Sequence, residues 1–274
     1  MPADDGGRYF YVRDGETTWS PGWKPCKTPL DHYECRHGMG YTSITGEKNG
    51  MRVNTLFFVP PGDNVEIQRL RIENRSQERR RITLFSFVEW CLWNAEDDMT
   101  NFQRNFSTGE VEVEGSVIFH KTEFRERRDH YAFYGVNQDI DGFETDRDTF
   151  LGPYSGFDQP AAVTEKRARN TIAHGWSPIA SHRIEVELGP GEHRELVFQL
   201  GYVEVPGNDK WAAPGVINKR PAQALISRYD SIDKVDRAFA ALRDYWADLL
   251  SRYRVESADP RLDRMVNTLS LIHI

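Results

Sequence analysis

The sequence predicts a mainly β protein: a large antiparallel β-sandwich followed by a short α-helical linker. Two observations support the sandwich. Apolar and polar residues alternate over several short stretches, and clusters of Gly, Pro, Asn and Asp separate these stretches. A third observation supports the helical linker, because after Pro206 the apolar residues recur every three or four positions.

The first expected hairpin covers residues 51–74. Residues 51–59, MRVNTLFFV, are rich in β-branched and aromatic side chains, and residues 60–64, PPGDN, are turn formers. In the strand that follows, the apolar alternation is shifted by one residue at Gln68 and Arg69. This shift predicts a β-bulge at those two residues.

Residues 81–90 are expected to form the central strand, because apolar side chains occupy both of its faces. A second hairpin is expected later in the chain. Residues 184–188 and 196–202 both alternate, and the turn formers Gly-Pro-Gly at 189–191 lie between them.

Helices are expected after the last strand. Pro221 can open a first short helix, and Ser231 can cap a second. Asp259 followed by Pro260 predicts the start of a third helix. The second helix carries one apolar stripe, formed by Val235, Phe239, Leu242, Trp246, Leu249 and Tyr253.

Composition excludes several classes of function. The 274 residues carry a formal net charge of -7, which disfavours nucleic acid as a partner. The sequence contains no run of about 18 apolar residues and no secretory leader, so neither a membrane nor export is expected.

The cysteines point to a reducing compartment. Cys26, Cys35 and Cys91 cannot all pair within one chain, and without a secretory signal they are expected to stay thiols in the cytoplasm. His32 and His37 lie near the first two cysteines in the sequence. Their spacing fits no usual zinc pattern, so no metal site is expected.

Five unusual strings carry a resemblance to a known family. They are GGRYFYV at 6–12, RHGMGY at 36–41, LFSFVEWCLWN at 84–94, TEFRERRDH at 122–130 and FETDRDTFLG at 143–152. In this order they resemble the N-terminal part of the cellobiose phosphorylases of glycoside hydrolase family 94. The resemblance runs from about Pro2 to Asn267.

The resemblance implies a domain organisation. Residues 1–218 would form a super-sandwich like that of galactose mutarotase, with its start truncated, and residues 219–255 would form a helical linker. Residues 256–267 would begin an (α/α)6 catalytic barrel. The final LSLIHI is a translation of CTGTCTCTTATACACATC, a transposon end used in sequencing libraries, so residues 268–274 are expected to be a foreign tail.

The resemblance also implies an activity. Such enzymes are cytosolic homodimers that cleave cellobiose with inorganic phosphate, inverting the anomeric carbon, to give α-glucose 1-phosphate and glucose. No cofactor is needed, because phosphate attacks and one carboxylic acid protonates the leaving oxygen. The family places that acid and the phosphate ligands in the barrel, so no catalytic residue is expected in this chain. Glu96, Asp97 and Asp98 are interpreted as solvated loop charges.

Two residues are expected to bind substrate. By the resemblance, residues 93–104 reach the active site of the partner subunit, where Asn94 and Arg104 border the acceptor glucose. An amide and a guanidinium can position hydroxyls but do not transfer protons at neutral pH.

Other readings of the sequence stay open. The chain could be a stand-alone carbohydrate-binding sandwich, or the same domain of a cellodextrin or laminaribiose phosphorylase. Trp19, Trp23 and Trp176 could stack on sugars, although isolated tryptophans more often belong to a core.

Overall fold

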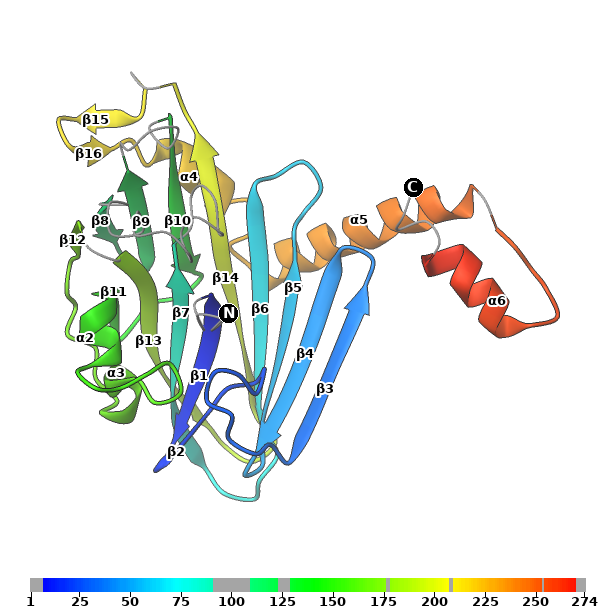
Figure 1. Ribbon diagram of the computed structural model, residues 1–274, viewed down its shortest axis with the longest axis horizontal. Coiled ribbons are helices and arrows are strands. Elements are labelled where there is room, and N and C mark those ends of the chain that lie inside the picture. The colour runs from blue at the N-terminus through cyan, green and yellow to red at the C-terminus, as the bar shows by residue number, and fades with distance from the viewer. Residues whose placement is uncertain are drawn as a thin grey trace.

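The computed structural model describes residues 7–90, 109–122, 129–175, 178–206, 209–252 and 254–269. In these ranges two antiparallel sheets pack face to face (Figure 1). The five-stranded sheet has the order β11 (Gly142–Asp146), β13 (Pro178–Leu188), β7 (Arg80–Glu89), β1 (Arg8–Asp14) and β2 (Thr17–Trp19). The nine-stranded sheet has the order β12 (His174–Gly175), β8 (Gly109–Glu114), β9 (Val117–Thr122), β10 (His130–Val136), β14 (His193–Glu204), β6 (Val65–Asn74), β5 (Met51–Phe58), β4 (Tyr41–Lys48) and β3 (His32–Gly38). The strands β15 (Trp211–Ala213) and β16 (Val216–Ile217) pair separately. The predicted fold class is confirmed.

Apolar side chains form three clusters. The first fills the space between the two sheets and includes Trp19 and Phe198. The second lies on the outer face of the nine-stranded sheet, under α4 (Arg220–Ile226) and α5 (Ile232–Ser251). The third lies on the outer face of the five-stranded sheet, where α2 (Arg147–Leu151) and α3 (Ala161–Thr164) cover it. Strands in both sheets are therefore buried on both faces.

Strand β6 is regular, and the predicted bulge at Gln68 and Arg69 is wrong. Its pairing with β5 and with β14 runs through both residues without a shift in register. The apolar residues change face instead. Ile67 packs into the cluster under the helices, whereas Leu70 packs between the sheets. A strand covered on both faces can place its apolar side chains on either one.

Strand β7 is the central strand of the five-stranded sheet, and residues Ile82 to Val88 are buried, as predicted. The first hairpin, between β5 and β6, is confirmed.

The predicted second hairpin is wrong. β13 pairs with β7 and β11, while β14 pairs with β10 and β6, so the turn between them carries the chain from one sheet to the other. The buried side chain of Asn74 holds this crossing, because its Nδ2 donates to the carbonyl oxygens of Leu188 and Gly189 at 3.0 and 3.1 Å. Two alternating strand sequences separated by a turn sequence look the same whether the strands pair with each other or belong to different sheets.

The three expected helix starts are confirmed. Pro221 lies in the first turn of α4, and Ser231 occupies the N-cap position of α5, although its side chain makes no capping hydrogen bond there. Asp259 precedes α6 (Pro260–Arg264), and its Oδ1 accepts a hydrogen bond from the backbone N–H of Arg261 at 2.9 Å.

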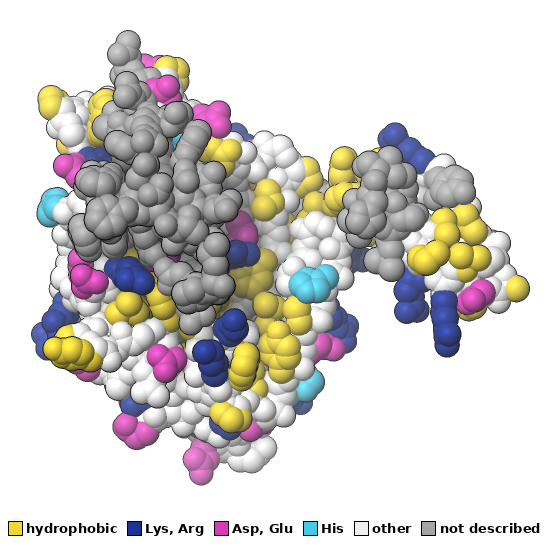
Figure 2. Space-filling model, in the orientation of Figure 1, with side chains coloured by type: hydrophobic (Ala, Val, Ile, Leu, Met, Phe, Trp, Pro, Cys, Tyr) yellow, Lys and Arg dark blue, Asp and Glu magenta, His cyan; other side chains and the backbone are white. Residues whose placement is uncertain are grey.

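Helix α5 packs on the sandwich through apolar side chains from Val235 to Trp246, and its end leads away toward α6 and the π-helical turn η3 (Met265–Leu269) (Figure 1). Apolar side chains lie on the surface of this protruding part, with Leu262 42% and Met265 51% exposed (Figure 2). No helix in the described ranges is long and apolar enough to cross a membrane. The predicted domain boundaries and the foreign tail stay predictions.

Candidate functional site

The predicted substrate-binding residues, Asn94 and Arg104, lie outside the described residues, as do Glu96, Asp97 and Asp98. Their roles therefore stay predictions. The described chain reaches Trp90 at the end of β7 and resumes at Gly109.

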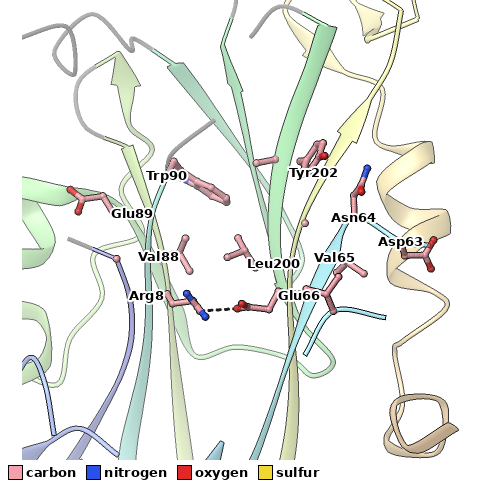
Figure 3. A pocket seen from close by; sticks show the side chains of 14 residues that line it. Arg8, Asp63, Asn64, Val65, Glu66, Val88, Glu89, Trp90, Leu200 and Tyr202 are labelled. Carbon is pink, nitrogen blue, oxygen red and sulfur yellow. Dashed lines mark ion pairs between the residues drawn. The ribbon is translucent and has the colours of Figure 1, made fainter. Parts of the chain in front are cut away.

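A cleft lies beside Trp90, at the end of the sandwich where β7 and β14 finish and β1 and β6 begin (Figure 3). Its volume is about 460 Å³, within the range of about 300–1,000 Å³ typical of ligand pockets. We call it the Trp90 cleft; it is lined by Gly7, Arg8, Val59, Asp63, Asn64, Val65, Glu66, Val88, Glu89, Trp90, Ala132, Leu200, Gly201 and Tyr202.

Antiparallel pairing brings these residues together. Arg8 lies opposite Val88 in the five-stranded sheet, and Glu66 lies opposite Leu200 in the nine-stranded sheet. Val88 and Leu200 belong to the core between the sheets, and they give the cleft an apolar floor (Figure 3).

An ion pair crosses the cleft from one sheet to the other. The Nε of Arg8 lies 2.8 Å from Oε1 of Glu66 (Figure 3). Both side chains have further support. The guanidinium of Arg8 lies over the ring of Phe57, 5.2 Å from its centroid, and Nε2 of Gln68 donates to Oε1 of Glu66 at 2.8 Å.

A buried polar chain leads from this ion pair into the core. The hydroxyl of Tyr134 donates to Oε1 of Gln68 at 3.2 Å, and the Tyr134 ring packs against His182 at 5.1 Å between centroids. Oγ of Ser86 lies 3.0 Å from Nδ1 of His182 and accepts a hydrogen bond from its backbone N–H at 3.0 Å.

The titratable side chains of this buried polar network, His182 and Tyr134, are neutral near pH 7. Burial lowers the pKa of His182 to about 3, and burial also raises the pKa of Tyr134. Neither group is suited to transfer a proton at neutral pH. This network of side chains instead holds the Glu66 carboxylate in position in the cleft.

Trp90 forms an aromatic wall of the cleft. Its ring stacks on His120 with 5.4 Å between centroids and 19° between planes. Tyr202, 40% exposed, lines the cleft from β14 and contacts His130 at 6.4 Å between ring centroids.

Each carboxylate that lines the cleft has an arginine partner. Glu66 pairs with Arg8, Glu89 pairs with Arg147 at 3.1 Å, and Asp63 pairs with Arg228 at 2.6 Å. A carboxylate held by a guanidinium is suited to accept hydrogen bonds rather than to act as a general acid. The described part of the cleft therefore fits binding.

The other sequence candidates lie elsewhere. Trp19 is fully buried in the core, Trp23 is 44% exposed but does not line the cleft, and Trp176 lies outside the described residues. The sequence analysis did not predict that Trp90 lines a cleft, because a tryptophan at the end of an apolar strand is expected to be a core residue. Its position directly before a polar segment was the available signal.

Two of the cysteines and histidines that were considered for zinc lie together on one strand. Cys35 Sγ and His37 Nε2 lie 3.5 Å apart on β3. Within the described ranges, no three His, Cys, Asp or Glu residues are placed to hold a metal ion.

Residues 1–232 match the sequence profile of the family described as "Glycosyl hydrolase 94, supersandwich domain". The chain belongs to this family. The family predicted from the sequence is therefore confirmed, and the sandwich with both of its sheets is the supersandwich domain.

Relatives carry the names of disaccharide phosphorylases. The chain is 29% identical to the N,N'-diacetylchitobiose phosphorylase of Vibrio furnissii, over 98% of this chain and 32% of that protein. It is 30% identical to the solabiose phosphorylase of Paenibacillus borealis, over 81% of this chain and 30% of that protein. The chain thus spans about a third of the length of these curated relatives.

A likeness to a solved structure supports the fold alone. A bacterial glucoamylase complexed with acarbose matches with a TM-score of 0.53 and 10% identity, over 90% of this chain and 33% of that one. Cellobiose as the substrate stays a prediction, because the relatives above are named for other sugars.

Proposed function

We propose that this chain is the N-terminal supersandwich domain of a disaccharide phosphorylase. The observation that carries the proposal is the family match over residues 1–232, together with relatives named as phosphorylases that align along most of the chain. The intact protein would use inorganic phosphate as co-substrate and no other cofactor, and would act in the cytoplasm. Cys26 and Cys35, which are free thiols, are consistent with that compartment.

The proposed reaction needs an attacking phosphate and a carboxylic acid, and these groups need not lie in the same domain as the sandwich. In an inverting phosphorolysis, phosphate attacks the anomeric carbon while a carboxylic acid protonates the leaving sugar oxygen. The bond to the leaving oxygen breaks as the bond to phosphate forms. The described carboxylates of the Trp90 cleft are paired with arginines, and the chain spans about a third of the length of its curated relatives, so we assign the acid and the phosphate ligands to the rest of the intact protein.

For the substrate we propose cellobiose, on the basis of the five sequence strings. N,N'-diacetylchitobiose and solabiose are the competing sugars, because the relatives carry those names. The test is phosphorolysis by the intact protein, with release of sugar 1-phosphate measured for each disaccharide. Turnover of cellobiose above the others supports the proposal. Turnover of another disaccharide alone corrects the substrate, and no phosphorolysis of any of them overturns the function.

We propose that Asn94 and Arg104 line the acceptor site of a partner subunit in a homodimer. Losing a hydrogen bond from a charged group costs roughly 1.5–3 kcal/mol, so Arg104→Ala should weaken acceptor binding by about ten- to a hundredfold. Asn94→Ala should weaken it less, because a neutral hydrogen bond contributes roughly 0.5–1.5 kcal/mol.

The test is the affinity for the acceptor sugar in the synthetic direction, measured with the intact protein. Arg79→Ala is the matched control, because Arg79 is an exposed arginine that pairs with Glu187 and does not line the cleft. Unchanged acceptor affinity in both variants would remove these residues from the site. A monomeric active enzyme would exclude the contribution from a partner.

A further inference from the structure

We propose that the Trp90 cleft binds one neutral pyranose ring, stacked on Trp90, with its hydroxyls bonded to Arg8 and Glu66. The choice of sugars rests on the proposed function, and the site itself rests on the geometry of the described residues.

The aromatic wall suits the apolar face of a sugar. A pyranose presents C–H groups on its ring face, and a flat aromatic side chain can cover them. Trp90 is half-buried, and the stacking on His120 fixes one face of its ring, which leaves the side toward the cleft for a ligand. Val88 and Leu200 extend this apolar surface along the floor (Figure 3).

The ion pair supplies the complementary polar edge. Arg8 uses Nε for Glu66, and no other hydrogen bond of its guanidinium is found within the described residues, so Nη1 and Nη2 can donate to a ligand. Glu66 receives both Arg8 and Gln68 on Oε1, which leaves Oε2 as an acceptor. Adjacent donors and an acceptor match two neighbouring hydroxyls, since each hydroxyl both donates and accepts.

The pair is also held in place before any ligand arrives. Phe57 lies under the Arg8 guanidinium, and Gln68, in turn bonded to Tyr134, fixes the Glu66 carboxylate. Groups that are already ordered lose less conformational entropy on binding.

The charge of the cleft favours a neutral ligand. Among the described lining residues, each of the three carboxylates is paired with one arginine, so none of these groups leaves an unpaired charge to attract an anion. If the phosphate of a sugar phosphate bound at Arg8, it would lie close to the Glu66 carboxylate, and these two negative charges would repel each other. We therefore expect glucose and cellobiose to bind and glucose 1-phosphate to bind more weakly.

The test is titration of this 274-residue chain with glucose, cellobiose and glucose 1-phosphate, followed by calorimetry and by ligand-observed NMR. Trp90→Ala should weaken binding of the neutral sugars by roughly five- to tenfold through loss of stacking. Arg8→Ala should weaken it by roughly tenfold or more. Trp23→Ala is the matched control, because Trp23 is 44% exposed and does not line the cleft.

Circular dichroism establishes that each variant is folded. If Trp90→Ala does not fold, Tyr202→Ser replaces it, because Tyr202 lines the same cleft and is 40% exposed. The proposal is overturned if the folded chain binds neither neutral sugar, if the cleft variants bind as tightly as the original chain, or if glucose 1-phosphate binds more tightly than glucose. Phosphorolysis by the intact protein is measured separately. If the intact protein is an active phosphorylase but this chain binds no sugar, the cleft proposal is rejected and the proposed function stands.

Discussion

The Nε of Arg8 on β1 lies 2.8 Å from Oε1 of Glu66 on β6, so one ion pair joins the five-stranded sheet to the nine-stranded sheet. Both residues line the Trp90 cleft, where the side chain of Arg8 is 47% and that of Glu66 21% exposed. At this exposure, solvent weakens the attraction between the two charges. The pair should therefore shape the cleft more than it stabilises the fold.

The first prediction concerns the strength of this pair. A double-mutant cycle of Arg8→Ala and Glu66→Ala, followed by urea unfolding, should give a coupling energy of about 0.2–1 kcal/mol. The coupling should decrease with added salt. Arg79 and Glu187, also 2.8 Å apart but 72% and 53% exposed, form the control pair and should couple less. A coupling well above this range would mean that the pair holds the sheets together.

The second prediction concerns acid stability. Burial lowers the pKa of His182 to about 3 from its ordinary value of 6.5. Between these values the unfolded chain binds a proton that the folded chain does not, so the stability from neutral His182 is complete above pH 6.5 and is lost as the pH falls toward 3. The loss should be about 1.4 kcal/mol per pH unit in that window.

The measurement is the free energy of unfolding of the original chain and of His182→Gln across that window. Glutamine does not titrate, so the difference between the two proteins should shrink as the pH falls. His193→Gln changes an exposed histidine on β14 and should leave the slope unaltered. Parallel pH profiles for the chain and His182→Gln would contradict the prediction.

Local patterns predicted the elements of the fold but not all of their pairing. The start of α6 could be read from Asp259 and Pro260 because a helix cap is a local structure. The partners of β13 and β14 could not, because two alternating strands and a turn fit a hairpin and a crossing between sheets equally well. The bulge assigned to Gln68 failed for a related reason: the helices that cover the outer face of β6 lie far away in the sequence.

The Trp90 cleft could not be predicted from the sequence, because its residues are far apart in the chain. Arg8, Glu66 and Trp90 lie on three strands, and only the packing of two sheets brings them together. Asn94 and Arg104 were predicted instead through a resemblance, and because they lie outside the described residues their roles stay predictions.

The third prediction concerns the two free thiols of the described structure. Burial, and then the nearby Asp158 carboxylate, raise the pKa of Cys26 to about 12 from 9.0. The thiolate is the reactive form, so at pH 8 Cys26 should react with iodoacetamide roughly a thousandfold more slowly in the folded chain than in urea. The same raised pKa means that stability is lost as the pH rises above 9, because the unfolded thiol releases its proton first.

The test uses a variant in which Cys26 is the one remaining cysteine, made by Cys35→Ser and Cys91→Ser. A variant that keeps Cys35 alone is the control and should be labelled readily in the folded state, because Cys35 lies half-buried on the edge strand β3. Labelling of folded Cys26 at nearly the rate seen in urea would show that its pocket opens freely.

The last prediction concerns how α5 is attached. Phe239 packs between Tyr41 and Phe58 of the nine-stranded sheet, at 5.1 and 5.2 Å between ring centroids. Removing a fully buried phenylalanine costs about 3–5 kcal/mol, and Phe239 is only half-buried, so Phe239→Ala should lower the free energy of unfolding by about 2 kcal/mol.

Tyr245→Ala, on the same helix, provides the comparison. Tyr245 is 55% exposed and is not part of the apolar cluster under α5, so its loss should change the free energy of unfolding by less than about 0.5 kcal/mol. Urea unfolding followed by circular dichroism measures both variants. Equal effects would mean that α5 does not dock through the Phe239 contact, whereas the expected difference would show that the buried side of the helix holds it to the sheet.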